Sequence, residues 1–218
     1  MCSARVEPSR RVLLAALNGL AHMRWPSPKG PLVPPSDPSP VLYIIACGGR
    51  PAGQLPAFVG FAQEQGWDVC VIATPDGTKF LDAAHLADLT VHPVRSQYKD
   101  PDEPDVLPPA DAFVIAPATF NMINKLAQGI SDTLALGLLN EAVGLGLPMA
   151  AVPWPNVALA RHPVFLRSIA TLREWGVRII LDPSRLPGPT GIPAVFPWAD
   201  LRAELTELRQ AVEDQAVG

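Results

Sequence analysis

Basic residues and cysteines are both scarce in this chain, and each shortage excludes a class of protein. Lysine and arginine number 17 against 21 aspartates and glutamates, which gives a net charge of −4. Proteins that bind nucleic acid or an anionic membrane surface usually carry a basic patch, so we expect neither partner. The cysteines Cys2, Cys47 and Cys70 form no CxxC pair and are not paired with histidines. We therefore expect no metal site and no disulfide framework, and we expect reduced thiols in a cytoplasmic protein.

Long hydrophobic runs are also missing. The most apolar stretch near the N-terminus, residues 10–23, follows two arginines and is too short to span a bilayer. No small-residue cleavage site follows it, so it does not read as a signal peptide. We expect a short amphipathic helix there, packed on the domain or on a neighbouring subunit.

Proline, by contrast, is plentiful, and it marks the boundaries of the chain's parts. Residues 25–40 and 182–197 contain too many prolines to form long helices or strands. They divide the sequence into residues 1–40, a central domain at 41–182, and a proline-rich flap with a final helix at 183–218. We find no internal repeats.

Within the central domain, apolar strand-like runs alternate with helical spacing. The runs lie at 41–46, 68–74, 111–117, 149–154 and 177–182, with a further short one at 89–94. Continuous apolar strands alternating with amphipathic helices are typical of a parallel sheet covered on both faces. The predicted fold class is therefore α/β, with a parallel sheet of five to six strands and helices on both faces.

In such sheets, ligands bind beyond the carboxyl ends of the strands, so the strand-to-helix corners are the candidate site. The first corner reads "CGGRPAG", and its Gly48 and Gly49 allow backbone N–H groups to approach an anion. The glycine spacing is not GxGxxG, and an ordinary glycine-containing turn explains it as well. Thr74, at the end of the second run, either caps the next helix or contacts a phosphate.

A more specific corner follows the strand at 111–117, where the chain reads "PATFNMINKLAQGISDTL". Either Thr119 or Asn121 can cap the helix that begins there, but capping accounts for only one of them. Asn124 and Asp132 are further polar residues on the same segment. A side-chain amide both donates and accepts hydrogen bonds, which suits a ligand contact. From the residues alone, a ligand site and plain capping explain this corner equally well.

This segment resembles the PASANT motif and the following helix of the homo-oligomeric flavin-containing cysteine decarboxylases. That family's motif is Pro-x-Ser-Ala-Asn-Thr, and its helix ends in Gly-x-Cys-Asp-Asn-Leu. The residues in register are Pro117, Thr119, Asn121, Lys125, Gly129, Asp132 and Leu134, whereas Phe120, Met122, Ser131 and Thr133 depart from the pattern.

A second segment, "VPWPNVALA", resembles the same family's Pro-x-Met-Asn-x-x-Met-Trp clamp. Pro153 and Asn156 match this motif, while Pro155, Leu159 and Ala160 replace its Met and its Met-Trp pair. The similarity covers residues 41–182, which is most of the chain.

The resemblance implies a Rossmann-like flavoprotein that binds FMN between the subunits of a trimer or of a dodecamer built from trimers. It implies phosphate contacts from Gly48, Gly49, Thr74 and Thr78, and contacts near the flavin from Pro117, Ala118 and Thr119. It gives Asn121 a role toward the flavin ring or the substrate carboxylate, and it places Pro153 and Asn156 in the substrate clamp. The implied partners are further copies of the chain and a small molecule or peptide that ends in cysteine.

The family's catalytic histidine is missing at the expected place, which here holds Glu103. A carboxylate can act as a base if burial raises its pKa toward neutrality. However, the segment that contains Glu103, "KDPDEPD", is more typical of a solvated acidic loop. His92 is an alternative base, or else an ordinary residue at a strand edge. The candidate catalytic residues are therefore Asn121, Glu103 and His92.

The coenzyme A branch of the family also uses a cysteine in a C-terminal flap, and this chain has no cysteine after Cys70. That absence disfavours phosphopantothenoylcysteine decarboxylase itself. It is compatible with FMN-dependent oxidative decarboxylation of a C-terminal peptidyl cysteine to an aminoenethiol. The alternatives are an FMN-binding family member that has lost catalysis and acts as a partner or regulatory subunit, and a flavin prenyltransferase-like enzyme.

Overall fold

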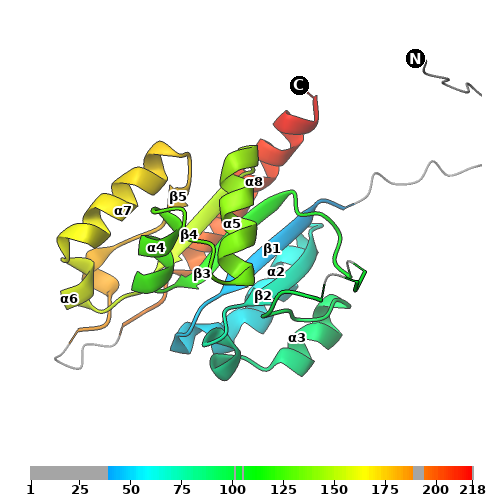
Figure 1. Ribbon diagram of the computed structural model, residues 1–218, viewed down its shortest axis with the longest axis horizontal. Coiled ribbons are helices and arrows are strands. Elements are labelled where there is room, and N and C mark those ends of the chain that lie inside the picture. Colours follow the sequence, from blue (N-terminus) through cyan, green and yellow to red (C-terminus); the bar gives the residue numbers. More distant parts are fainter. Residues whose placement is uncertain (1–38, 101, 105, 189–193, 218) are drawn as a thin grey trace, which may run out of the picture. The chain divides into compact units, whose positions relative to one another are not determined.

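The central feature of the fold is a single parallel β-sheet (Figure 1). The computed structural model describes residues 39–100, 102–104, 106–188 and 194–217, so the expected N-terminal helix at 10–23 and nearly all of the first proline-rich stretch lie outside the described part. The strands run in the order β2-β1-β3-β4-β5. Their bounds are β1 Val41–Ala46, β2 Asp68–Ala73, β3 Ala112–Ala118, β4 Met149–Pro153 and β5 Arg178–Ile179. The predicted α/β class is confirmed, with five strands among the described residues.

Helices cover both faces of this sheet (Figure 1). On one face, α4, α5 and α7 pack on the sheet, and on the other face α2, α3 and α8 do so. None of the described helices combines the length and the apolar content that crossing a membrane requires. The helical bounds are η1 Arg50–Gln54, α2 Leu55–Glu64, η2 Gly77–Phe80, α3 Ala83–Thr90, α4 Phe120–Leu126, α5 Leu134–Leu145, α6 Val157–Ala160, α7 Pro163–Glu174, η3 Pro183–Arg185 and α8 Trp198–Val217.

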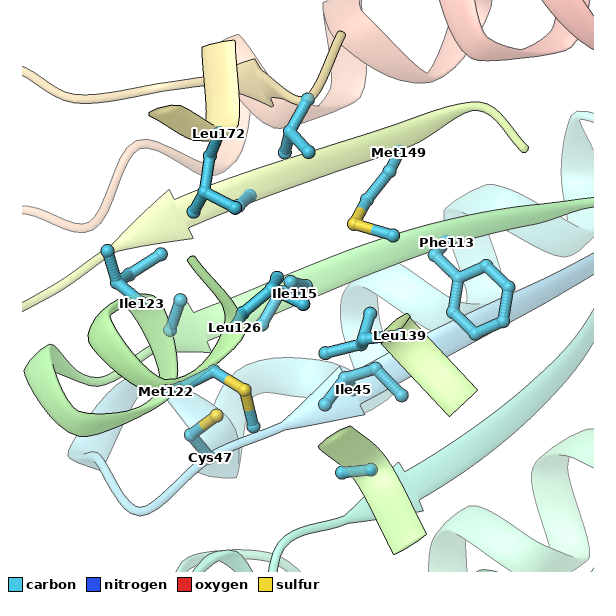
Figure 2. Packing of buried hydrophobic residues seen from close by; sticks show 14 of the residues in the cluster. Ile45, Cys47, Phe113, Ile115, Met122, Ile123, Leu126, Leu139, Met149 and Leu172 are labelled. Carbon is cyan, nitrogen blue, oxygen red and sulfur yellow. The ribbon is translucent and has the colours of Figure 1, made fainter. Parts of the chain in front are cut away.

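The buried strands explain why their sequences are continuously apolar. Successive side chains of a strand point to opposite faces, so a strand covered on both sides needs apolar residues throughout. In β1, Leu42 and Ile44 join the core beneath α2 and α8, while Ile45 joins the core beneath α4 and α5. Figure 2 shows Ile45 and Ile115 of neighbouring strands in this second core, with Leu126 of α4 and Leu139 of α5 packed on them.

The final helix, α8, packs on the sheet. Leu201, Leu205 and Leu208 recur at helical spacing, and all three are buried in the core formed with α2. Arg178 of the edge strand β5 forms an ion pair with Glu204 of α8 at 2.8 Å. The segment that follows the second proline-rich stretch therefore completes one face of the same sheet.

The additional strand predicted at 89–94 is not formed. Leu89 and Thr90 end α3, and the backbone of the described segment that follows pairs with the sheet only at a single bridge between Ile72 and Arg95. Pro93 has no N–H group to donate, so a ladder along β2 cannot extend through it. The edge of the sheet beside β2 is thus covered by an irregular segment.

Two buried thiols make the stability of this core sensitive to alkaline pH. Burial raises the pKa of Cys47 and of Cys70 from an ordinary 9.0 to about 12, with nearby Asp68 adding to the shift at Cys70. Above pH 9 the unfolded chain loses these protons while the folded protein keeps them, so the free energy of unfolding falls as pH rises toward 12. We expect a loss on the order of 1 kcal/mol per pH unit for each thiol.

Urea unfolding measured at about pH 8 and about pH 10 checks this prediction, since the two values lie on either side of the ordinary thiol pKa. A variant carrying both Cys47→Ala and Cys70→Ala should lose less stability over that interval than the wild-type protein. Equal losses in the two proteins would show that the thiols do not cause the effect.

Candidate functional site

A cavity of about 310 Å³ opens where β1, β2 and β3 end, and we call it the switch-point cavity. The sheet order reverses between β1 and β3, because β2 follows β1 on one side and β3 lies on the other. Ligands of open parallel sheets bind at such switch points. The cavity is lined by Gly48, Thr74, Pro75, Asp76, Thr119, Asn121, Met122, Lys125, Thr133 and Leu136.

The β1 corner offers unused backbone donors to this cavity. Within the described residues, the amides of Gly48 and Gly49 have no hydrogen-bond partner, while the Gly49 carbonyl accepts from Ala52 N at 3.0 Å. A Cβ atom on Gly49 would lie 3.2 Å from Cγ of Pro117, closer than side chains normally pack. Gly49 therefore keeps the β1 corner close to the β3 corner, and the two glycines leave two N–H groups for a ligand.

At the β2 corner, Thr74 shapes the backbone. Its Oγ1 accepts a hydrogen bond from Gly77 N at 3.0 Å, and its own N–H donates to Ala46 O at 2.9 Å. Thr78 donates its hydroxyl proton to Pro75 O at 2.8 Å, and it does not line the cavity. Thr74 thus holds the turn against β1 while it also borders the cavity.

At the β3 corner, the structure shows which of the two polar residues caps the helix. Thr119 caps α4, since its Oγ1 accepts from Met122 N at 3.2 Å. Asn121 plays no part in the cap, and its exposed side chain lies at the cavity. Pro117 and Ala118 are buried in β3, where their carbonyls accept from Cys47 N and Trp154 N. Asn121 is therefore free to contact a ligand.

The charged groups at the cavity are already paired. Lys125 forms an ion pair with Asp132, and Lys79 Nζ lies 2.7 Å from Asp76. The hydrogen bond and the charge of Lys79 lower the pKa of Asp76, so this carboxyl is ionised at neutral pH. An anion in the cavity would rely on the glycine amides and on the N-terminus of α5, where Thr133 and Leu136 border the cavity.

The structure does not bring the two candidate bases to this cavity. His92 Nε2 lies 2.8 Å from Oδ1 of Asp68, the first residue of β2, so His92 lies at the opposite, amino end of the strand. Glu103 lies in an exposed loop, where its Oε2 accepts from Asp100 N at 3.3 Å. It borders a different hollow, formed with Tyr98 and Val106.

The proposed clamp residues lie further along the carboxyl edge. Pro153 ends β4 opposite Ala118, and exposed Asn156 caps α6 by accepting from Leu159 N at 2.9 Å. Neither residue lines the switch-point cavity.

His162 lies close to the clamp residues, and the sequence analysis did not identify it. Its ring lies 5.7 Å from that of Phe120, between centroids, and its Nδ1 accepts from Val164 N at 3.2 Å. Because that cap occupies Nδ1, Nε2 is the ring nitrogen that is left for a ligand. The sequence pattern that could have drawn attention to His162 is its place directly before Pro163, because proline is common at the first position of a helix.

Asn124 is a buried polar residue that the cavity does not use. It is 8% exposed, and within the described residues its Oδ1 has no hydrogen-bond partner. Leaving such an oxygen unpaired costs about 1–3 kcal/mol.

We therefore expect Asn124→Ala to raise the free energy of unfolding by about 1 kcal/mol, since alanine also favours the helix. Thermal unfolding checks this, and a destabilised variant would show that Asn124 has an essential partner.

The fold and the cavity define a class of protein, namely a parallel α/β protein with a polar, anion-compatible site at the switch point of its sheet. The order β2-β1-β3-β4-β5 is the order found in flavodoxin, in which the same point holds FMN. Comparison with known proteins makes the class more specific. The model of the Flavoprotein family matches residues 54–209. The chain belongs to the Flavoprotein family.

Among curated relatives, the chain is 30% identical over 181 residues to the coenzyme A biosynthesis bifunctional protein CoaBC of Mycolicibacterium smegmatis, covering 80% of this chain. The chain spans only 42% of that bifunctional relative's length. A probable phosphopantothenoylcysteine decarboxylase of Streptococcus mutans is 28% identical over 158 residues, which are 69% of this chain and 84% of the relative.

Solved structures share the fold. The epidermin biosynthesis protein EpiD from Staphylococcus aureus matches with a TM-score of 0.52 and 27% identity, over 64% of this chain and 81% of its own. A PPC decarboxylase mutant complexed with pantothenoylaminoethenethiol matches with a TM-score of 0.63 and 21% identity, over 79% and 99% of the two chains. Together with the family match, these structures confirm the resemblance to the flavin-containing cysteine decarboxylases.

Proposed function

We propose that the switch-point cavity binds FMN and that the protein uses it to decarboxylate a cysteine oxidatively. The observation that carries this proposal is the meeting of Gly48, Thr74, Thr119 and Asn121, from three strand ends, at one cavity. The unpaired amides of Gly48 and Gly49 and the N-terminus of α5 fit a phosphate. The Flavoprotein family match and the FMN-dependent cysteine decarboxylase SpaF, whose fold is shared with a TM-score of 0.58, support the choice of cofactor.

In this proposal, FMN supplies the acceptor for the two electrons that leave the thiol-bearing carbon. Asn121 donates from its side-chain amide to the substrate carboxylate and holds it beside the cavity, and Asn156 contributes from the clamp. A peptide that ends in cysteine would lose CO₂ and two hydrogens and become an aminoenethiol. A peptidyl substrate is favoured because no cysteine follows Cys70, so a flap thiol that returns electrons to the product is not present.

Self-association is part of the same proposal. Asn121 and Asp76 are exposed at the rim of the cavity, so one copy of the chain leaves a flavin ring partly open to water. A second copy that closes this rim would complete the site, as expected for a trimer or a dodecamer. Native mass spectrometry of the flavin-loaded protein tests this, and a monomer with full flavin occupancy would contradict it.

The reaction is tested by incubating the flavin-loaded protein with short peptides that end in cysteine and following each peptide by mass. Loss of CO₂ and two hydrogens from a Cys-ending peptide, with no change in its serine-ending counterpart, is the expected result. If none of a broad set of Cys-ending peptides changes mass or reduces the flavin, the protein is not a peptidyl-cysteine decarboxylase.

One observation favours a second candidate function. Among the described residues that line the switch-point cavity, none is a histidine, and neither His92 nor Glu103 reaches it. An FMN-binding subunit without catalysis, acting as a partner or regulatory subunit, would show this arrangement. Flavin binding without reduction by any Cys-ending peptide would support this second function over the first.

A further inference from the structure

A second cavity lies on the other face of the sheet, and we call it the aromatic cavity. It measures about 420 Å³ and opens between the start of η1, the exit of β4 and the segment that enters α8. Its buried Phe196 belongs to the core beneath α2 and α8, whereas Met122 and Leu136 of the switch-point cavity belong to the core beneath α4 and α5. Its lining residues include Arg50, Gln54, Trp154, Phe196 and Trp198.

One wall of this cavity is a cluster of aromatic rings that are fixed in place. The centroids of Trp154 and Phe196 are 5.1 Å apart, and those of Phe196 and Trp198 are 4.5 Å apart. Trp198 also packs on buried Phe58, and its Nε1–H donates to Oε1 of Gln54 at 2.6 Å. Such contacts hold the rings in one arrangement before any ligand arrives, so the wall is preformed.

The cavity also has a cation with nothing to neutralise it. Arg50 is exposed, and within the described part of the chain it forms no ion pair, hydrogen bond or ring contact. Exposed Arg161, Arg167 and Arg173 also lack a partner among the described residues, but Arg50 differs from them in lining this cavity. Among the described lining residues, Arg50 alone carries a charge, and most of the others are apolar or aromatic.

We infer that the aromatic cavity is a binding site for an apolar carboxylate, with the acid group on Arg50 and the apolar group against Trp154 and Phe196. A guanidinium binds a carboxylate through two parallel hydrogen bonds, and a flat apolar group is favoured by offset or edge contacts with the rings. The cavity volume lies within the range of small-molecule pockets. The aromatic cavity shares no lining residue with the switch-point cavity, although Trp154 lies between the clamp residues Pro153 and Asn156. The inferred site goes beyond the proposed function.

The test is binding of 3-phenylpropanoate to the protein as purified, measured by calorimetry, with 3-phenylpropanamide as the uncharged probe. We expect saturable binding of the acid, weaker binding of the amide, and no release of flavin. Arg50→Gln should weaken binding of the acid by about tenfold or more, because a charge-assisted hydrogen bond is lost, and should leave the amide unchanged. Trp154→Ala should weaken both probes.

Arg173→Gln is the matched control, since Arg173 is an exposed arginine on α7 that lies outside both cavities. It makes the same change of net charge and should leave both affinities as in the wild type. Equal binding of the acid by the Arg50 and Arg173 variants would overturn the inference. Equal affinity of the wild-type protein for the acid and the amide would also overturn it, and so would displacement of flavin by the acid. The absence of saturable binding below about 10 mM would do the same, because a dissociation constant above that value corresponds to very weak binding.

Discussion

Replacing Gly77 with alanine is expected to lower the melting temperature by about 10 °C and to abolish flavin binding. A Cβ atom on Gly77 would lie 2.2 Å from the backbone oxygen of Ala46 and 2.9 Å from Oγ1 of Thr74. The first neighbour is part of β1 and cannot move aside without shifting that strand. Overpacking against such a rigid neighbour costs about 3 kcal/mol. The displaced turn also carries Thr74 and Asp76, which line the switch-point cavity.

Gly60→Ala is the matched control for this variant. Gly60 lies inside α2, and a Cβ atom there would have no neighbour within 4 Å. Alanine favours a helix over glycine by about 1 kcal/mol, so this variant should be slightly more stable and should bind flavin normally. Thermal unfolding and flavin titration of the two variants make the comparison. Similar melting temperatures for both would mean that the β2 turn does not pack on β1 as described.

The second large effect is expected at Asn121. Asn121→Asp keeps the shape of the side chain but replaces a donor with a negative charge, which repels a substrate carboxylate. We expect kcat/KM for a Cys-ending peptide to fall at least about a hundredfold, or roughly 3 kcal/mol of transition-state stabilisation. Folding should be unaffected, because Thr119 supplies the cap and an acidic residue suits the first turn of a helix.

Gln128→Glu is the charge-matched control for Asn121→Asp, since Gln128 follows α4 and lies outside the switch-point cavity. It should keep the activity of the wild-type protein. Flavin occupancy, read from visible absorbance, separates lost catalysis from lost cofactor in each variant. If Asn121→Asp keeps full activity with flavin bound, Asn121 does not bind the substrate carboxylate.

The strands and the main corner could be predicted from local sequence because each has a local cause. β1 and β3 are buried on both faces, which requires the apolar runs at 41–46 and 112–118. The polar residues directly after β3 were visible as a group, and the structure places Thr119 and Asn121 at one cavity with Gly48 and Thr74. From the sequence alone, capping and ligand binding explained these residues equally well. Only the geometry shows that Thr119 is sufficient as the cap of α4.

What could not be predicted depends on distant parts of the chain. Thr133 and Leu136 reach the cavity because α5 packs beside α4, and no local sequence pattern predicts that packing. The aromatic cavity needs Trp154, directly after β4, and Phe196, from the segment before α8, to meet. The strand expected at 89–94 is not formed, because α3 continues to Thr90 and Pro93 has no N–H group to donate to a ladder. Long-range packing decided the first two outcomes, whereas the missing strand has a local cause in Pro93.

The central claim is that the switch-point cavity holds FMN, and the visible absorbance of the purified protein tests it most directly. The chromophore released by denaturation is then identified by mass. We predict a yellow protein that releases FMN, and a Gly77→Ala variant that is colourless. A colourless wild-type protein that also takes up no added FMN would contradict the claim, and the assignments at Gly48, Thr74, Thr119 and Asn121 would fall with it.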